Sequence, residues 1–332
     1  MTHISLAHGN GGRKMRQLIE DLFTPLLYES PGSNQLDAAP MVLPPGEALI
    51  TTDAFTVKPL EFPGGDIGSL AVHGTVNDLA VSGATPLYLS LNVILEEGLE
   101  IALLERIVVS LARAAKACGV KVLAGDTKVV PRGEGSGIYL ATTGIGIRQP
   151  GLQLGMGYCQ PGDRLLVSGP LGDHGTAVML AREEFGLRGD LQSDAASVLP
   201  LTQALLDLNG LRFMRDPTRG GLATVAHELA QASGTTIRLH ASRIPVREPV
   251  HAVCQILGYD PYYLACEGRV VAVVSEAQAE QALQRWQALP NGEQAAIIGV
   301  IEVGQSIVIL ETELGGERVL PELEQEALPR IC

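Results

Sequence analysis

Aspartates in short glycine-rich or strand-end segments are the residues of this sequence best suited to carry chemistry. They lie in the segments TTD, VNDL, GDTK and RDPTRGG, and they are Asp53, Asp78, Asp126 and Asp216. Backbone N–H groups of glycine-rich turns and helix N-termini attract anions. Carboxylates spread over several loops suit Mg²⁺ that bridges a triphosphate. The pattern therefore indicates a magnesium–nucleotide site.

A structural role for the same aspartates is the alternative, because Asp is favoured at turns and helix N-caps and glycine supplies positive φ. The sequence contains no GxxxxGK[ST] phosphate loop. The HGNGG segment at 8–12 is by itself a weak indication of phosphate binding. What favours the nucleotide site is the recurrence of such segments along one chain.

A thiol is the last residue of the sequence, since the chain ends with PRIC and Cys332. Packing rarely explains a cysteine at a free end; the alternative is an accidental thiol on a disordered end. The five cysteines are an odd number and include no CxxC pair. That pattern argues against a disulfide framework and a structural zinc site, and it fits a reducing cytoplasm.

Composition limits the classes of protein that remain. A chain of 332 residues, 46% hydrophobic and 18% charged, predicts a globular protein of two domains. Its formal charge is −13 and it has no run rich in Lys and Arg, which argues against nucleic acid as a partner. The apolar runs are shorter than about 18 residues and no signal peptide is recognised, so we expect no membrane span and a cytoplasmic location.

Hydrophobic periodicity predicts which elements position these residues. In the first half, helical spacing at 68–82 and 101–118 accompanies four short β-rich segments, which are 48–52, 87–94, 120–123 and 138–147. In the second half, helices and strands alternate again after a segment rich in Gly, Pro and Gln. The expected helices are 174–185, 198–208, 222–232, 250–257 and 277–289. The expected strands are 164–168, 211–214, 236–240, 269–275, 296–301 and 307–310.

These elements predict two α+β domains rather than one large doubly wound sheet. The expected boundaries are 1–152 for an ATP-binding and dimerisation domain and 153–314 for a second α+β domain. Residues 315–332 carry several glutamates and two prolines with little periodicity. We therefore expect a flexible C-terminal tail that ends in the reactive Cys332.

Several of these segments together resemble a known family. NDLAVSGATP, AGDTKVV, SGPLGDHG, RDPTRGGL and the terminal PRIC resemble the HypE family of hydrogenase maturation proteins. That family belongs to the superfamily of aminoimidazole ribonucleotide (AIR) synthetase, selenophosphate synthetase and thiamin monophosphate kinase. The resemblance covers nearly the whole chain, and GDHG with a terminal PRIC is specific to HypE. It implies a two-domain PurM-like fold, N-terminal domains that pair into a β-barrel-like homodimer interface, and ATP bound in a cleft.

The resemblance also implies an activity. A partner, HypF, would carbamoylate Cys332, and the protein would then act as an ATP-dependent carbamoyl dehydratase that converts the thiocarboxamide to a thiocyanate. The cyano group would pass to iron on a HypC–HypD complex and supply the cyanide ligands of [NiFe]-hydrogenase. Because an amide oxygen is a poor leaving group, it must first be phosphorylated by ATP.

Site residues follow from this implied reaction. Mg²⁺ would be held by the four aspartates named above, and Cys332 would carry the substrate. Lys128 would place positive charge where negative charge develops, and Glu267 would take the carbamoyl proton. The ATP contacts expected from the motifs are Gly11, Gly12, Asn77, Thr127 and Arg219.

Each of these roles has a plainer alternative. Lys128 can be a solvated lysine at a strand end, and Arg219 can form a salt bridge instead of reaching a phosphate. Glu267 can be structural, since the family more usually has Asn-Glu-Gly where this chain has Cys266-Glu267-Gly268. Cys266 itself is expected to be a small buried residue.

Two other functions stay open. One is a small-molecule ATP-dependent synthetase or kinase of the same superfamily, which would have no need of a terminal thiol. The other is a non-catalytic ATP-binding scaffold for maturation partners, whose ATP hydrolysis would not depend on Cys332. His174 and His227 are given no role, because a histidine on an apolar helix face is more often a hydrogen-bonded core residue.

Overall fold

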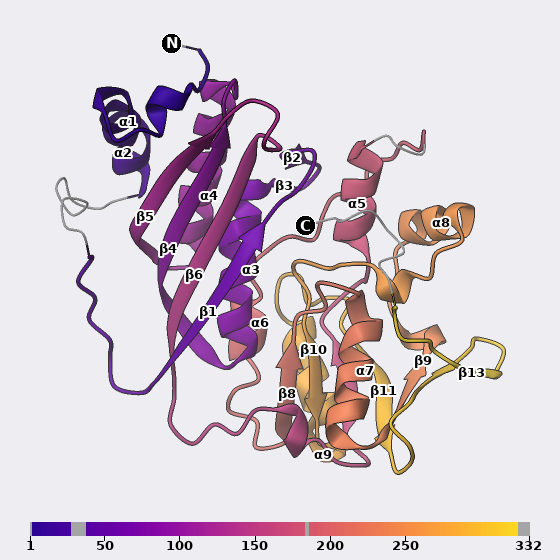
Figure 1. Ribbon diagram of the computed structural model, residues 1–332. Helices are drawn as coiled ribbons and strands as arrows, with labels where there is room; N and C mark the ends of the chain where they lie inside the picture. The colour runs from indigo at the N-terminus through magenta and orange to yellow at the C-terminus, as the bar shows by residue number, and fades with distance from the viewer. Residues whose placement is uncertain (1, 28–37, 183–185, 325–332) are drawn as a thin grey trace. The chain divides into compact units, whose positions relative to one another are not determined.

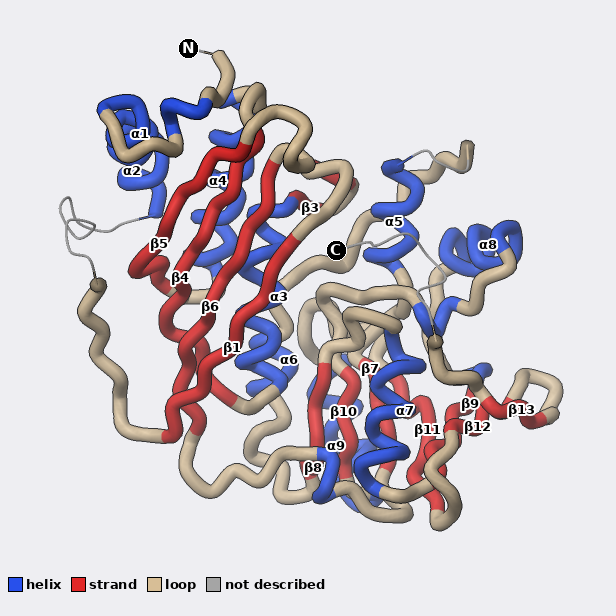
Figure 2. The backbone as a smooth tube through the Cα atoms, in the orientation of Figure 1, coloured by secondary structure: helices blue, strands red, loops and turns tan. Residues whose placement is uncertain are grey.

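The computed structural model describes residues 2–27, 38–182 and 186–324 (Figures 1 and 2). The chain forms two compact units that meet in sequence between Pro150 and Gly151, apart from residues 80–83, which belong to the second unit. This position lies inside the segment rich in Gly, Pro and Gln. Both units combine helices with a sheet, so the predicted two-domain α+β organisation is confirmed.

A four-stranded sheet forms the centre of the N-terminal unit. Its order is β1-β6-β4-β5, and only β4 and β5 run parallel. The strands are β1 (Glu47–Phe55), β4 (Ala84–Glu96), β5 (Lys121–Val130) and β6 (Ile138–Arg148). All four lie where alternation in the sequence predicts them, and all are longer than predicted.

Two helices cover one face of this sheet, α3 (Ile67–Val81) and α4 (Ile101–Ala117) (Figure 1). The apolar stripe of α4 is buried as its periodicity predicts; it consists of Leu104, Ile107, Val108, Leu111, Ala114 and Ala115. Thr142 of β6 donates a hydrogen bond to the carbonyl of Ala71 in α3 at 3.2 Å. Thr142 therefore marks the side of the sheet that faces α3.

The opposite side of the sheet, here called the open face, is covered by no helix or strand of the described N-terminal unit. Ile50 is paired with Ile145, which is paired with Tyr88. Residues directly opposite one another share a face, so these three lie on the same side. Ile94 follows Tyr88 at an even spacing and joins them. Ile50 and Ile94 remain 72% and 37% exposed, unusual for isoleucines on a central sheet.

Small elements at the N-terminus were not predicted. They are η1 (Leu6–His8), α1 (Arg13–Leu18), the π-helical turn η2 (Ile19–Phe23) and α2 (Thr24–Leu27). A short hairpin, β2 (Glu61–Phe62) with β3 (Gly65–Asp66), precedes α3. The N-terminal helices contact α4, and together with residues of β4 and β5 they line a pocket.

The C-terminal unit is built on a seven-stranded sheet of order β13-β12-β9-β11-β7-β10-β8 (Figure 2). All neighbours are antiparallel except β12 and β9. The strands are β7 (Arg164–Val167), β8 (Leu211–Arg215), β9 (Thr236–His240), β10 (Val271–Val274), β11 (Ala296–Glu302), β12 (Val308–Glu311) and β13 (Glu317–Val319). Except for β13, each lies at a predicted position.

Helices pack on both faces of this sheet. Leu165 of β7 belongs to a buried cluster with Leu222 of α7, whereas its neighbour Leu166 belongs to a second cluster with Trp286 of α9. Successive residues of a strand point to opposite faces, so the two clusters are the two layers of the core. The helices are α5 (Asp173–Arg182), α6 (Leu199–Gln203), α7 (Gly221–Ser233), α8 (Glu248–Leu257) and α9 (Glu276–Gln287), with the 3₁₀ turns η3 (Met156–Tyr158), η4 (Ala241–Arg243) and η5 (Pro261–Tyr263).

Two expectations for this unit differ from the structure. The helix predicted at 198–208 ends at Gln203, because side chains of α9 use its carbonyl groups: Trp286 donates to Leu201 at 2.9 Å and Arg285 to Ala204 at 2.8 Å. The tail expected at 315–332 begins instead with β13, after which Leu320 is completely buried, and its last residues, 325–332, lie outside the described residues. In the part of the chain that the structure describes, no helix is long and apolar enough to cross a membrane.

Candidate functional site

The aspartates of the N-terminal unit form two separate groups. The first lies between β1 and α3, where the Thr51 hydroxyl donates to Oδ2 of Asp78 at 2.8 Å. Asp53 is paired with Thr142 in the sheet, and Thr142 contacts α3, so Asp53 faces the helix-covered side as Thr51 does. Asn77, next to Asp78, is buried. The structure thus brings two predicted magnesium ligands to one side of β1.

The second group is on β5. Oδ1 of Asp126 accepts the Thr127 N–H at 2.8 Å, and Oδ2 lies 3.2 Å from Nζ of Lys128. The Asp126 and Lys128 side chains are 53% and 64% exposed, so their ion pair is screened by water and contributes little to stability. Lys128 can therefore turn to another anion at little cost in free energy.

Strand order separates these two groups. β6 and β4 lie between β1 and β5, which places Asp53 and Asp126 three strand spacings apart, about 14 Å. Asp126 is paired with Asn92, and Lys128 with Ile94, so both project from the open face, opposite to Asp53. A single N-terminal unit therefore cannot bring all three of its predicted magnesium ligands to one ion. Within residues 2–27, 38–182 and 186–324, no three His, Cys, Asp or Glu residues are grouped to hold a metal.

A pocket of about 170 Å³ lies beside Asp126 and Thr127. Its other walls are apolar and come from the unpredicted N-terminal helices and from β4 and β5; they are Met15, Ile19, Phe23, Leu27, Leu91, Val93 and Gly125. Gly11 and Gly12 precede α1, and a Cβ atom at either position would meet no atom within 4 Å. Small-molecule sites are usually about 300 Å³ or larger, so this pocket can receive only part of a nucleotide.

In the C-terminal unit, the predicted residues lie on two loops that touch. Asp216 and Arg219 follow β8, and Glu267 precedes β10. The N–H of Cys266 donates to the carbonyl of Pro217 at 3.0 Å and so joins the loops. Asp216 and Glu267 are only 6% and 4% exposed. Burying a carboxylate costs free energy unless the protein supplies it with hydrogen bonds or a partner charge, so Asp216 and Glu267 must each be compensated by neighbouring groups.

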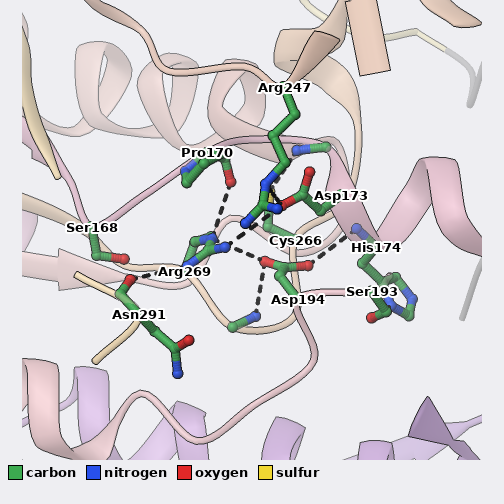
Figure 3. Close-up of polar contacts among 12 residues, drawn as sticks. Ser168, Pro170, Asp173, His174, Ser193, Asp194, Arg247, Cys266, Arg269 and Asn291 are labelled. Carbon is green, nitrogen blue, oxygen red and sulfur yellow. Dashed lines mark hydrogen bonds and ion pairs between the residues drawn. The ribbon is translucent and has the colours of Figure 1, made fainter. Parts of the chain in front are cut away.

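Asp194 is the residue that holds the Glu267 loop in place (Figure 3). Its Oδ1 accepts the N–H of Glu267 at 3.3 Å and of His174 at 3.1 Å, and its Oδ2 accepts the N–H of Gly268 at 3.3 Å. The sequence does not indicate Asp194, because an Asp in a loop of small residues has the pattern of an ordinary turn. Only the contact between distant loops reveals its role.

A buried charge network continues from Asp194 through Arg269. The Arg269 guanidinium lies 3.4 Å from Asp194, 3.6 Å from Asp173, and donates to the carbonyl groups of Pro170 and Asn291 at 3.0 Å each (Figure 3). Arg247 pairs with Asp173 at 3.0 Å from the other side. Burial, and to a lesser degree Asp194, raise the pKa of Asp173 to about 6 in spite of both arginines. The network fixes the GDHG segment against the Glu267 loop.

His174 and Cys266 both lie buried in positions that suit structural residues. Burial lowers the pKa of His174 to about 4, so its ring is neutral at pH 7, and its Nδ1 lies 2.8 Å from the Ser193 hydroxyl. Cys266 is completely buried, accepts the Gly172 N–H at 3.2 Å, and has a pKa raised well above its ordinary value by burial. The prediction that Cys266 is a small buried residue is confirmed. Cys332 lies outside the described residues.

Comparison with known proteins assigns both units. Residues 36–148 match the family described as AIR synthase related protein, N-terminal domain, and residues 160–311 match the corresponding C-terminal domain. The fold expected from the sequence is thus confirmed. A thiamine monophosphate kinase from Aquifex aeolicus shares this fold at 20% identity, with a TM-score of 0.59 over 80% of this chain and 88% of the kinase chain.

Closer relatives match from end to end. The carbamoyl dehydratase HypE of Azotobacter vinelandii is 47% identical over 99% of this chain and 97% of its own length. The carbamoyl dehydratase HypE of Escherichia coli is 44% identical over the full length of both chains. A crystal structure of hydrogenase maturation protein HypE in complex with ATP matches with a TM-score of 0.93 and 44% identity, over 98% of this chain and 99% of that one. The chain therefore belongs to the HypE family of carbamoyl dehydratases, hydrogenase maturation proteins built from the two AIR synthase related domains.

Proposed function

We propose that this protein is an ATP-dependent carbamoyl dehydratase that converts an S-carbamoyl group on its own Cys332 to a thiocyanate for [NiFe]-hydrogenase maturation. The match of the whole chain, at 47% identity, to a protein named carbamoyl dehydratase HypE carries this proposal. A relative of 44% identity binds ATP. The terminal PRIC supplies the thiol on which the group would be carried.

The reaction divides into two balanced steps. The carbamoyl oxygen attacks the γ-phosphorus of ATP, ADP leaves, and one N–H proton is lost, which gives an S-linked iminophosphate. The C–O bond then breaks, phosphate departs with its electron pair, and the second N–H proton is removed to leave S–C≡N. Magnesium bound to the triphosphate would neutralise its charge and align it for in-line attack.

Lys128 and Glu267 are the side chains we assign to these steps. Lys128 forms an exposed ion pair with Asp126 that it can give up at little cost, so its ammonium can move to the developing charge on the carbamoyl oxygen or the transferred phosphoryl group. Glu267 is buried on a loop whose N–H groups are held by Asp194, which suits a base that must meet an N–H proton at a fixed position.

The predicted ligand set fits magnesium by its chemistry, since Mg²⁺ takes oxygen ligands, keeps several waters and usually binds one or two carboxylates together with substrate phosphates. In the N-terminal unit, Asp53 and Asp78 form a set of two such carboxylates, and Asp126 supplies a single one. Asp216 belongs to the other unit. The ATP contacts proposed earlier divide in the same way, with Gly11, Gly12, Asn77 and Thr127 in the N-terminal unit and Arg219 in the C-terminal unit.

We infer a homodimer that covers the open face. Its exposed isoleucines, Ile50 and Ile94, make an uncovered sheet face unstable in water. Asp126 and Lys128 project from that same face, whereas Asp53 lies at the opposite edge of the sheet. If one nucleotide is to meet both edges, a second copy must supply one of them. We therefore propose that Asp53 and Asp126 in one working site come from different subunits.

HypF is the partner we propose as carbamoyl donor, because a related HypE of 42% identity has been solved as a HypE–HypF complex. We propose a HypC–HypD complex as the acceptor of cyanide at its iron. The four described cysteines are buried thiols, which fits a reducing compartment, and we propose a cytoplasmic location.

Intact-mass analysis tests the proposed function directly. After incubation with HypF, carbamoyl phosphate and ATP, the chain should gain the mass of one carbamoyl group and then lose the mass of one water. A Cys332→Ala chain should do neither and should hydrolyse no ATP in response to carbamoyl phosphate. If Cys332→Ala turned over ATP and supported hydrogenase maturation normally, the proposed function would be wrong, and a scaffold or a small-molecule kinase would be favoured.

A further inference from the structure

The segment SGPLGDHG, residues 168–175, takes no part in the proposed chemistry, but it contacts the loop that carries the proposed base. Its Gly172 N–H donates to Sγ of Cys266 at 3.2 Å. Its Gly175 N–H donates to the carbonyl of Ala265 at 3.1 Å. These two acceptors belong to the residues directly before the proposed base. The segment therefore supports the loop of that base.

The same segment also encloses the guanidinium of Arg269. A Cβ atom at Gly169 would lie 2.8 Å from Nη1 of Arg269, which is too close for any side chain at this position. The guanidinium cannot move aside at little cost, because it is buried and donates to the carbonyl groups of Pro170 and Asn291 at 3.0 Å each. Arg269 is therefore a fixed positive charge at the centre of the network (Figure 3).

Two buried carboxylates, those of Asp173 and Asp194, share this one guanidinium. Oδ2 of Asp173 lies 3.6 Å from Nη2 of Arg269. Oδ2 of Asp194 lies 3.4 Å from Nε of Arg269 and also accepts the N–H of Gly268. If Asp173 lost its charge, the attraction between Arg269 and Asp194 would be unopposed. Oδ2 of Asp194 would then turn toward the guanidinium and away from the N–H of Gly268, because bonds between two charged groups are the stronger ones.

Arg247, the N-cap residue of α8, supports the charge of Asp173 from the other side. Its Nε lies 3.0 Å from Oδ2 of Asp173. Oδ1 of Asp173 is buried and accepts no hydrogen bond from residues 2–27, 38–182 and 186–324. Such a carboxylate keeps its charge only through its partner charges. The Arg247 side chain is 51% exposed, so one of the two arginines on which Asp173 depends is open to solvent.

We propose that Asp173 and Arg247 are positioning residues for the dehydration and make the Glu267 loop sensitive to acid. They act on that loop through Arg269 and Asp194. This inference rests on the proposed function, to which it adds a role for the GDHG segment. While Asp173 is ionised, Asp194 holds the loop in place for catalysis. When Asp173 takes up a proton, Asp194 turns away and the base is displaced.

The groups around Asp173 agree with a response to acid. In the described chain, the charged and titratable side chains around it are Arg247, Arg269, Asp194, His174 and Cys266. Burial raises the pKa of Asp173 from the ordinary value of 3.8 to about 6; Asp194 adds to this, and the two arginines oppose it. Burial also keeps His174 and Cys266 neutral at pH 7, since it lowers the pKa of the first and raises that of the second. Asp173 is therefore the member of this group that changes charge as the pH falls through about 6.

The first test measures the pH dependence of dehydration. Carbamoylated Cys332 is prepared beforehand and the single turnover is started with ATP, so that HypF takes no part. The wild-type rate should fall with a midpoint near pH 6. Arg247→Gln should raise this midpoint by about one pH unit, the low end of the effect of a nearby opposite charge, because Arg247 is half-exposed. The variant should thus be about threefold slower than the wild type at pH 6.5, and the difference should vanish as the pH is raised.

Two further variants serve as matched comparisons for Arg247→Gln. Arg247→Lys keeps the positive charge and should restore the wild-type midpoint. Arg243→Gln removes an exposed arginine of the η4 turn and should leave the midpoint at its wild-type value. An Arg247→Gln protein with the wild-type midpoint, or one that is slower by the same factor at every pH, would overturn the inference.

Asp173→Asn tests whether Arg247 acts through Asp173. The amide is neutral at every pH, so dehydration should be slower by about 100-fold, the scale of a small misplacement, and the break near pH 6 should disappear. Adding Arg247→Gln to Asp173→Asn should change the rate no further, because the two residues act in one chain of contacts. A break near pH 6 that persists in Asp173→Asn, or an undiminished effect of Arg247→Gln in that background, would assign the acid response to other groups.

Amide chemical shifts report on the loop without the reaction. In the uncarbamoylated protein, the backbone N–H signals of Glu267 and Gly268 should titrate with a midpoint near pH 6 in the wild type. The midpoint should be higher in Arg247→Gln, and the titration should be absent in Asp173→Asn. Wild-type signals that do not move across this range would refute the coupling. If they respond as expected while carbamoylated Cys332 never loses water, the proposed function fails and the coupling of the loop to Asp173 stands.

Discussion

The Asp194 carboxylate accepts the backbone N–H of Glu267 at 3.3 Å, which ties a loop of unassigned function to the proposed base. Its other oxygen accepts the N–H of the next residue, Gly268, also at 3.3 Å. Two consecutive N–H groups bound by one carboxylate leave the Glu267 backbone little freedom to rotate. The orientation of the side chain is therefore decided outside the segment that carries it.

Asp194→Asn should separate positioning from chemistry. The amide keeps the size of the carboxylate but turns one acceptor into a donor that faces an N–H group, so the Glu267 loop should shift. We expect dehydration to fall about 100-fold, the scale of a small misplacement of a catalytic group. The unfolding free energy should fall by about 3 kcal/mol, since buried Arg269 loses one of its two partner charges and keeps only Asp173. Asp190→Asn, at an exposed position, is the control; equal dehydration rates in the two variants would contradict the role of Asp194.

Gly268 should tolerate no side chain. A Cβ atom there would lie 1.9 Å from the backbone oxygen of Asp194, and the obstacle is main chain that cannot rotate away. Gly268→Ala should therefore displace one of the two loops, lower the unfolding free energy by about 1 to 3 kcal/mol and abolish dehydration. Gly157→Ala, where a Cβ atom meets nothing within 4 Å, should change neither quantity. Urea titration and the intact-mass assay measure both, and wild-type behaviour of Gly268→Ala would refute the packing argument.

Lys128→Ala and Glu267→Gln should accumulate the carbamoylated chain. Loss of a positive charge at the transferred group costs about 10²- to 10³-fold, and loss of a positioned base about 10²- to 10⁴-fold. Lys116→Ala, an exposed lysine at the end of α4, serves as the control for lost charge. Quench-flow with intact-mass detection would show which step stops. Full conversion to the thiocyanate in either variant removes that residue from the mechanism.

Mixed dimers should reveal whether the site is shared between subunits. Asp53→Asn and Asp126→Asn chains should each be inactive alone. When they are co-expressed, a mixed dimer would hold one site with both substitutions and one with neither. Random pairing then restores about a quarter of wild-type activity. Co-expression of Asp53→Asn with Asp78→Asn, which lie on the same side of β1, should restore none. A mixture of Asp53→Asn and Asp126→Asn with no activity would place both aspartates in one subunit's site.

Stability should fall with acid because of His73. Burial lowers its pKa from the ordinary value of 6.5 to about 4, so between these values the unfolded chain binds a proton that the folded chain does not. The unfolding free energy therefore rises with pH across that window, by about 1.4 kcal/mol per pH unit from this group, and is fully recovered above pH 6.5. His73→Leu should flatten urea-denaturation free energies between pH 5 and 6.5 relative to His3→Gln, an exposed control. An unchanged slope would contradict a buried neutral His73.

The local pattern of apolar residues was enough to predict most helices and strands of the fold. The stripe of α4 from Leu104 to Ala115 and the alternation in β1 and β6 are properties of contiguous residues, and both elements lie where they were predicted. The π-helical turn at Ile19–Phe23 and the two-residue hairpin strands lack a periodicity long enough to recognise. The buried Leu320 was hidden among acidic residues, although its core contacts anchor the tail.

The types of the candidate site residues could be proposed from the sequence, but their arrangement in space could not. The segments that carry Asp53, Asp126 and Glu267 stand out by their glycines and acids. Strand order decides that Asp53 and Asp126 lie at opposite edges of one sheet, and strand order is a tertiary property. Asp194 is separated from Glu267 by 73 residues and meets it only after both loops have packed on Arg269.

The close fit of Gly268 on the Asp194 backbone also bears on how such chains can be recombined. The two segments are far apart in the gene but share one steric arrangement, so the path of the backbone at 194 and the absence of a side chain at 268 must be kept together. In chimeras between relatives, crossovers that fall between codons 194 and 268 should yield fewer working enzymes than crossovers outside that interval, even where both parents are fully active.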